Sequence, residues 1–194
     1  MIMNILKRKQ GQVWMETLLY TVVGLAIMGT VLSFAIPKLE QNKERAIIAE
    51  QISTLKTLDA LVLDLANAPA GNTRVYSVSI DKGALTIDGS KDTISFSIPE
   101  IGLKYSEEGV SVKDGRVSVL TSSVGKKKYK IDLSTYYEVS GINITTDRQD
   151  RIMEFTPAPT PYTLQIAREQ SFHVDSTTGE NVIKSYITFV EKKK

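Results

Sequence analysis

The stretch that decides the organisation of this chain is KRKQGQVWME, residues 7–16, which runs directly into TLLYTVVGLAIMGTVLSFAI, residues 17–36. Three basic residues come first, a single carboxylate follows at Glu16, and the next 20 residues carry no charge. At about 1.5 Å per residue, a helix of that length is roughly 30 Å long, which matches the hydrocarbon core of a bilayer. Soluble helices are seldom apolar on all sides over such a length. We therefore expect a membrane-spanning helix.

Basic residues precede this apolar run and predict its orientation. Lys7, Arg8 and Lys9 stand before it, and the first acidic residue of the chain is Glu16. Moving Lys and Arg across a bilayer is costly, so basic flanks stay on the cytoplasmic side. We expect the N-terminus to lie in the cytoplasm and the chain beyond residue 36 to lie outside the cell.

A second helical pattern covers residues 38–66. Apolar residues recur there at spacings of three and four and form one stripe: Ile48, Ile52, Leu55, Leu58, Val62 and Leu65. The sequence NAPAG at residues 67–71 ends the pattern, and Pro37 at its start either kinks a single helix or separates two. A helix of about 55 residues far exceeds the usual globular length. We therefore expect a membrane, a bundle or a filament to cover its apolar faces.

After residue 71 the alternation of apolar and polar residues has a period of two, which predicts strands. Turn signals separate the strands at residues 81–83, 88–89 and 113–115. The expected strands cover residues 73–80, 85–87, 94–98, 110–112, 117–120, 127–133, 136–146, 152–155, 162–168, 172–174 and 181–190. The prolines at positions 157, 159 and 161 are interpreted as a surface crossover within one β domain.

These patterns predict an α+β fold class. A long N-terminal α-helix, transmembrane and then amphipathic, is followed by an antiparallel β-sandwich or jelly-roll-like domain. We expect three parts: a basic leader over residues 1–11, the helix over residues 12–67 and an extracellular β-rich domain over residues 72–194.

Composition and charge argue against several classes of function. The net charge is +2 and falls to −1 when the three basic residues of the leader are removed, which leaves no electrostatic footprint for nucleic acid. The chain has no cysteine and a single histidine, His173. A catalytic triad or a histidine-based metal site needs further partners. We expect neither an enzyme nor a bound metal or cofactor.

The combination of Gly11, Gln12 and Glu16 resembles the class III signal of type IV prepilins and archaellin-like proteins. In that family a membrane aspartic peptidase, the prepilin peptidase, cuts after a small residue that ends a basic leader, and a glutamate occupies the fifth position of the mature chain. A cut between Gly11 and Gln12 makes Glu16 that fifth residue. Glutamine as the first mature residue resembles the archaeal branch, although that branch often has serine where this chain has Trp14.

The resemblance implies a structural subunit of an archaeal type IV pilus-like surface filament. Its partners would be further copies of itself, membrane lipid before assembly, and the prepilin peptidase. The new α-ammonium at Gln12 of one subunit would neutralise Glu16 of a neighbour and set the register of assembly. The apolar side chains expected in the membrane or filament core are Trp14, Leu18, Leu19, Val22, Leu25, Ile27, Leu32 and Ile36.

Two other interpretations stay open. The chain can be a minor pilin or a single-pass anchored binding module that does not form the bulk of a filament. It can also be a secreted soluble protein, cut after the small-x-small site at residues 33–35. Against secretion, the apolar run exceeds the roughly 7–15 residues of such signals, and the helix after it shows no obvious core of its own. Asn143 begins a sequon, Asn-Ile-Thr, that permits N-glycosylation of an exported domain.

Overall fold

The computed structural model describes residues 3–174 and 181–192, and places side chains over residues 13–172 and 183–192. The chain forms two compact units, Met1–Lys43 and Glu44–Lys194. The boundary falls inside the long helix. The second unit therefore contains the end of that helix together with all of the strands.

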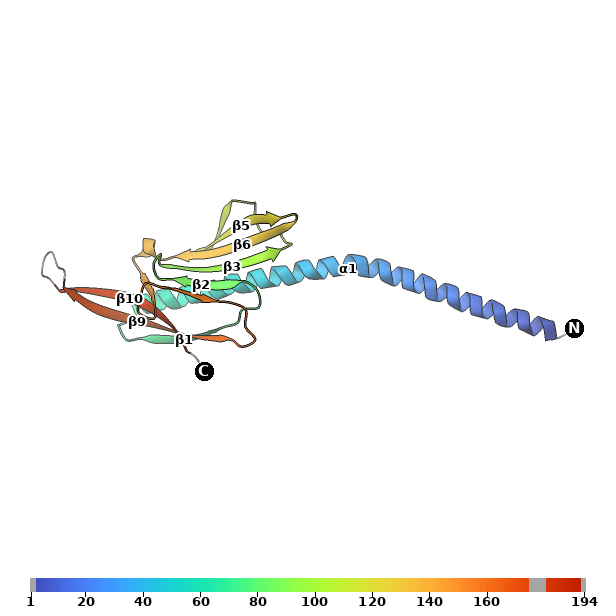
Figure 1. Ribbon diagram of the computed structural model, residues 1–194, viewed down its shortest axis with the longest axis horizontal. Helices are drawn as coiled ribbons and strands as arrows, with labels where there is room; N and C mark the ends of the chain where they lie inside the picture. Colours follow the sequence, from blue (N-terminus) through green and yellow to red (C-terminus); the bar gives the residue numbers. More distant parts are fainter. Residues whose placement is uncertain (1–2, 175–180, 193–194) are drawn as a thin grey trace. The chain divides into compact units, whose positions relative to one another are not determined.

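Helix α1 (Met3–Asn67) is continuous over 65 residues and contains Pro37 (Figure 1). Proline removes one backbone hydrogen bond and crowds the preceding turn, but good helix formers such as Leu39 and Glu40 follow it. The two helical patterns therefore belong to one helix. The helix begins at Met3 rather than at residue 12, because residues 5–10 of the basic head are mostly helix-forming Leu, Lys, Arg and Gln.

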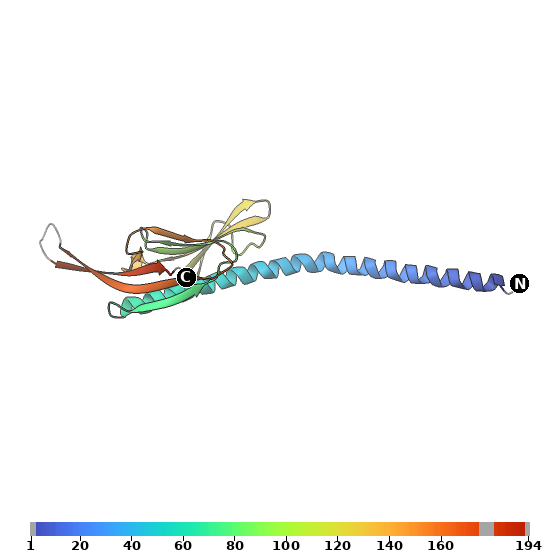
Figure 2. The ribbon, with the colours of Figure 1, turned by 60° about the horizontal axis from the view of Figure 1, so that its bottom comes forward.

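The strands form two sheets (Figures 1 and 2). Sheet A runs in the spatial order β1 (Thr73–Val78), β9 (Tyr162–Val174), β10 (Asn181–Glu191) and β7 (Asn143–Thr146). Sheet B runs in the order β4 (Ser111–Asp114), β5 (Val117–Gly125), β6 (Lys128–Tyr136), β3 (Thr93–Ile101), β2 (Ala84–Asp88) and β8 (Ile152–Phe155). Neighbouring strands are antiparallel except β10 and β7, which are parallel.

The predicted α+β class is confirmed as a long apolar N-terminal helix followed by mainly antiparallel sheets. One predicted strand, over residues 136–146, is wrong. The chain leaves sheet B at Tyr136, forms the 3₁₀ helix η1 (Glu138–Ser140) and joins sheet A as β7. The physical reason is that Tyr137 turns inward and is fully buried, while Gly141 ends η1 in the left-handed conformation with φ 65°. The strands predicted at 162–168 and 172–174 are a single strand, β9.

The apolar stripe of α1 lies in the core of the second unit. Its six side chains are 0–6% exposed and share one cluster with inward residues of both sheets, such as Phe96 of β3 and Phe189 of β10. The expectation that a membrane, a bundle or a filament covers this stripe is therefore wrong, because the sheets of the same chain cover it. Burial of each Leu, Ile or Val contributes roughly 1.5–3 kcal/mol.

Polar contacts also fasten the end of α1 to the strands around it. Lys56 pairs with Asp114 of β4 at 2.7 Å, and Asp59 accepts a hydrogen bond from Arg116 Nε at 3.1 Å. Arg116 is the residue before β5, so both contacts hold α1 against the β4–β5 hairpin. Two ion pairs thus flank the stripe where α1 meets the β4–β5 hairpin of sheet B.

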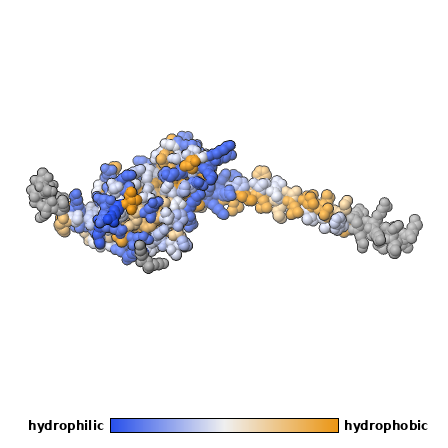
Figure 3. Space-filling model, in the orientation of Figure 1, coloured by the Kyte–Doolittle hydropathy of each residue, from blue (hydrophilic) through white to orange (hydrophobic). Residues whose placement is uncertain are grey.

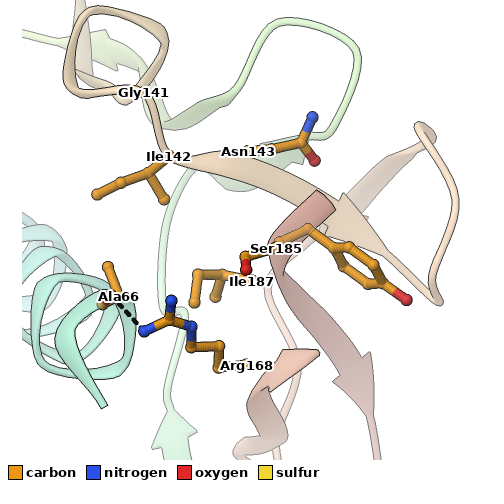
Figure 4. Close-up of a pocket in the computed structure, with 8 residues that line it drawn as sticks. Ala66, Gly141, Ile142, Asn143, Arg168, Ser185 and Ile187 are labelled. Carbon is orange, nitrogen blue, oxygen red and sulfur yellow. Dashed lines mark hydrogen bonds between the residues drawn. The ribbon is translucent and has the colours of Figure 1, made fainter. Parts of the chain in front are cut away.

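Arg168 of β9 closes the C-terminus of α1. Its Nη1 donates a hydrogen bond to the carbonyl oxygen of Ala66 at 2.6 Å and another to that of Ala68. Figure 4 shows the side chain reaching from β9 to the last turn of the helix, next to a small pocket of about 90 Å³. The last turn has no basic residue of its own. A cation from the sheet therefore donates hydrogen bonds to the terminal carbonyls and interacts favourably with the negative end of the helix dipole.

Candidate functional site

The candidate site is the apolar segment of α1, defined as residues 13–36. All eight side chains predicted to enter a membrane or filament core are exposed, by 49–66%: Trp14, Leu18, Leu19, Val22, Leu25, Ile27, Leu32 and Ile36. The most apolar stretch of α1 is long and apolar enough to cross a membrane, and none of it is buried. Figure 3 shows hydrophobic residues, in orange, gathered along the helix. Isolated soluble proteins seldom expose so much continuous apolar surface.

Apolar residues surround the helix in this segment. Runs of adjacent residues are exposed together, such as residues 13–15 and residues 18–20. Successive helical residues point about 100° apart, so such runs leave no polar face. The segment therefore requires an apolar environment on all sides rather than along one stripe.

The hydroxyl groups of the apolar segment are satisfied within the helix. Thr17, Thr21, Thr30 and Ser33 each donate a hydrogen bond to the backbone carbonyl four residues earlier, at 2.8–3.0 Å. Moving a hydroxyl group from water into an apolar medium is costly unless the group keeps a hydrogen bond. The back-bonded hydroxyls thus suit a segment that is surrounded by lipid or by other helices.

Glu16 is the one charged residue of the segment. Tyr20 Oη donates a hydrogen bond to Glu16 Oε1 at 3.3 Å, from one helical turn further on. No cation pairs with Glu16 among the residues whose side chains are described. Tyr20 was not among the residues predicted for this site, although a spacing of four residues places two helical side chains on the same face. A carboxylate in an apolar medium needs a cationic partner, and the described part of this chain offers only a phenol.

In comparisons with protein-family models, with curated proteins and with solved structures, nothing matched this chain.

Gly11 and Gln12 both lie within the helical backbone of α1, and their surroundings fall outside the part of the chain with described side chains. Gln12 precedes Glu16 by four residues. On a helix this separation is one turn, or about 6 Å along the axis. The amide nitrogen that a cut after Gly11 would free therefore lies one turn from the carboxylate on the same helix.

Asn143 lies at the start of β7, which is an edge strand of sheet A. Its side chain is exposed beside the small pocket next to Arg168, whereas Thr145 of the same sequon is buried (Figure 4). The amide that a glycan would join is thus accessible.

In the second unit, the buried residues Asp59 of α1 and Tyr137, which precedes η1, form a group with the exposed Arg116. Arg116 Nε donates to Asp59, its Nη2 donates to Ser140 Oγ at 3.1 Å, and its guanidinium lies 5.8 Å from the centre of the Tyr137 ring. Burial, reinforced by the charge of Asp59, raises the pKa of Tyr137 far above its ordinary value. The group joins α1 to η1 and to the β4–β5 turn through contacts within the protein. Among the described residues, no three metal-ligating side chains form a group, and the side chain of His173 lies outside the described residues.

Proposed function

We propose that this chain is a structural subunit of an archaeal type IV pilus-like surface filament, assembled through its apolar helix after removal of residues 1–11. One observation carries the proposal: an exposed helical segment, apolar on all sides, contains a single carboxylate at the fifth position after Gly11. The basic leader before it and the folded unit after it are in the order that such a subunit requires.

The assembly step joins this carboxylate to a new positive charge. Cleavage after Gly11 creates an α-ammonium at Gln12, and Glu16 of a neighbouring subunit accepts it in the apolar surroundings of packed helices. Two unit charges 4 Å apart attract each other by about 4 kcal/mol at an effective dielectric constant near 20. Displacing a subunit along its neighbour would leave both charges unpaired, so the pair selects one stagger.

The folded unit is displayed on the outside of the filament as a sandwich-type domain that encloses the end of α1. Because its own sheets cover the stripe from Ile48 to Leu65, that stripe contributes nothing to the contact between subunits. Cohesion comes from the apolar segment, whose side chains leave lipid and pack against the same segment of other copies.

The second candidate is a minor pilin or a single-pass anchored binding module. The burial of the stripe favours it, because the second unit has a core of its own and the remaining apolar segment suffices for one bilayer crossing. The same burial removes one argument against the secreted soluble form. The remaining argument against secretion is the length of the apolar run. Shearing of cells separates the first two candidates, because a bulk subunit is recovered in filaments while an anchored module stays with the membrane.

The test is mass spectrometry that identifies the first residue of the mature chain. Chain isolated from the surface of the producing cells should begin at Gln12, and Gly11→Val should keep the leader. The control is Gly24→Val, the same substitution at a glycine inside the apolar segment, and it should leave the cut before Gln12. A mature chain that begins at Ile36 would establish secretion, and an intact N-terminus at Met1 would establish an uncut anchor; either would refute the filament proposal.

A further inference from the structure

The outward face of sheet B carries a row of four hydroxyl side chains, here named the hydroxyl row: Thr86, Ser95, Ser134 and Ser118. They belong to the adjacent strands β2, β3, β6 and β5, and each is in direct register with the next. The residues that alternate with them, such as Leu85, Phe96 and Leu133, are buried in the core. The strand alternation therefore points the row away from the core.

The hydroxyl row forms the floor of a hollow of about 490 Å³. The four side chains of the row are short, whereas an exposed sheet face usually carries long side chains such as lysine and glutamate. A second hollow, of about 500 Å³, shares Thr86 and extends past Ser97 to Pro99. Together the two hollows follow strands β2 and β3, and each has the volume of a small-molecule site, about 300–1,000 Å³.

The walls of the first hollow add an aromatic ring and a carboxylate. Tyr136, at the end of β6, is 56% exposed. Asp88, at the end of β2, is only 8% exposed; its Oδ1 accepts hydrogen bonds from the backbone and hydroxyl of Ser90, while its Oδ2 lies 3.8 Å from Lys91 Nζ, beyond hydrogen-bonding distance. Among the residues with described side chains, this nearly buried carboxylate thus has no hydrogen-bond donor to its Oδ2, at the edge of the hollow.

The charges of the hollow are balanced locally. Asp88 has Lys91 beside it, and Asp132 pairs with Lys130 at 3.0 Å. The hydroxyl row itself carries no charge, and within the described part of the chain none of its four hydroxyls binds another protein group, in contrast to Thr93, which donates to the Lys91 carbonyl at 2.8 Å. The site therefore offers free neutral donors and acceptors without a net charge.

We infer that this hollow binds a neutral, polyhydroxylated ligand, such as a segment of a surface glycan. Hydroxyl groups can both donate and accept, and so can those of a sugar. The Tyr136 ring offers an apolar face for the C–H side of a sugar ring, and Asp88 Oδ2 accepts from a sugar hydroxyl. An apolar ligand would leave the hydroxyl row without partners, and an anionic ligand would find the neighbouring cations, Lys91 and Lys130, already beside carboxylates. The inference concerns the displayed unit alone and does not depend on filament assembly.

The test uses the full chain in a polyoxyethylene detergent, whose head group is not a sugar. The probes are immobilised neutral oligosaccharides built from glucose, galactose or mannose, with uronate and sulfate oligosaccharides as the charged set. At least one neutral oligosaccharide should bind, and the charged set should not. Absence of binding to every neutral probe, or a preference for the charged set, would overturn the inference.

Variants then locate the site. Ser95→Trp and Ser134→Trp fill the floor of the hollow, and each should weaken binding of the best neutral probe at least about tenfold. Tyr136→Ala should weaken it as well, whereas Tyr105→Ala, which removes an exposed tyrosine outside the hollow, should leave it unchanged. Undiminished binding in a tryptophan variant that keeps the near-ultraviolet circular dichroism of the folded unit would refute the location. If neither tryptophan variant folds, Tyr136→Ala decides, since it only trims an exposed ring.

Discussion

Replacement of Leu58 by alanine tests whether the second half of α1 belongs to the core of the folded unit. Leu58 is 0% exposed in the middle of the stripe, among side chains of both sheets. The matched control is Leu25→Ala, which makes the same chemical change in the same helix, at a side chain that is 63% exposed in the apolar segment.

The expected loss follows from the cavity that the substitution leaves. A buried leucine replaced by alanine costs about 2–5 kcal/mol, because the lost burial adds to the cost of an incompletely closed cavity. For a unit of this size, 1 kcal/mol lowers the unfolding midpoint by roughly 2–4 °C. Leu58→Ala should therefore lower the midpoint by roughly 4–20 °C, and Leu25→Ala should change it by less than about 2 °C.

The measurement is thermal unfolding of the full chain in detergent, followed by the near-ultraviolet circular dichroism of tyrosine. Tyr137 is fully buried in the unit and reports its packing. Trp14, the only tryptophan, lies in the apolar segment, so its fluorescence reports the detergent-covered helix and serves as a separate probe. Equal midpoints for the two variants would refute the burial of the stripe by the sheets, and would restore the need for a partner outside the chain.

Three further outcomes are expected. Glu16→Ala should abolish the filaments that electron microscopy detects in the sheared fraction, while the mature chain still begins at Gln12. The control Glu40→Ala, outside the apolar segment, should assemble normally. Normal filaments from Glu16→Ala would exclude the ion pair. Hydrogen bonds from Arg148 lower the pKa of Glu169, so the stability that this pair supplies is present above the ordinary value of 4.5 and is lost as the pH falls through the lower folded value. The unfolding midpoint should therefore fall less on acidification below pH 4.5 in Glu169→Gln. Gly83→Ala should destabilise the unit by about 1–3 kcal/mol more than Gly71→Ala: both glycines have positive φ, at 96° and 89°, but only at position 83 would a Cβ overlap the Ser97 carbonyl oxygen.

The helix and its stripe could be predicted because both depend on local periodicity. The spacing from Ile48 to Leu65 identified all six buried residues of the stripe. The partner of the stripe could not be predicted in this way, because it includes strands that begin roughly a hundred residues or more after Leu65, such as β9 and β10. Period-two patterns also locate individual strands well. They do not show where a chain leaves one sheet for another, which is why residues 136–146 were predicted as a single strand.

The two candidate sites also differ in whether the sequence alone can locate them. The apolar segment and Glu16 are contiguous in sequence, so their spacing is visible without a structure. The hydroxyl row is formed by residues at positions 86, 95, 118 and 134, and only the register of four strands brings them side by side. Serine and threonine at alternate strand positions are ordinary in any exposed sheet. No local pattern therefore distinguishes a binding surface from a solvated one.

The continuity of α1 has a mechanical consequence. The same helix that carries the apolar segment also carries the stripe, so tension applied to the second unit passes along one backbone into its core. Extraction of the helix lengthwise would have to slide all six stripe residues past the sheets and break the Lys56–Asp114 and Asp59–Arg116 contacts together. Contacts loaded in parallel in this way resist far more force than contacts that open one after another. The folded unit thus joins the apolar segment through a helix that lies in its core rather than through a loop at its surface.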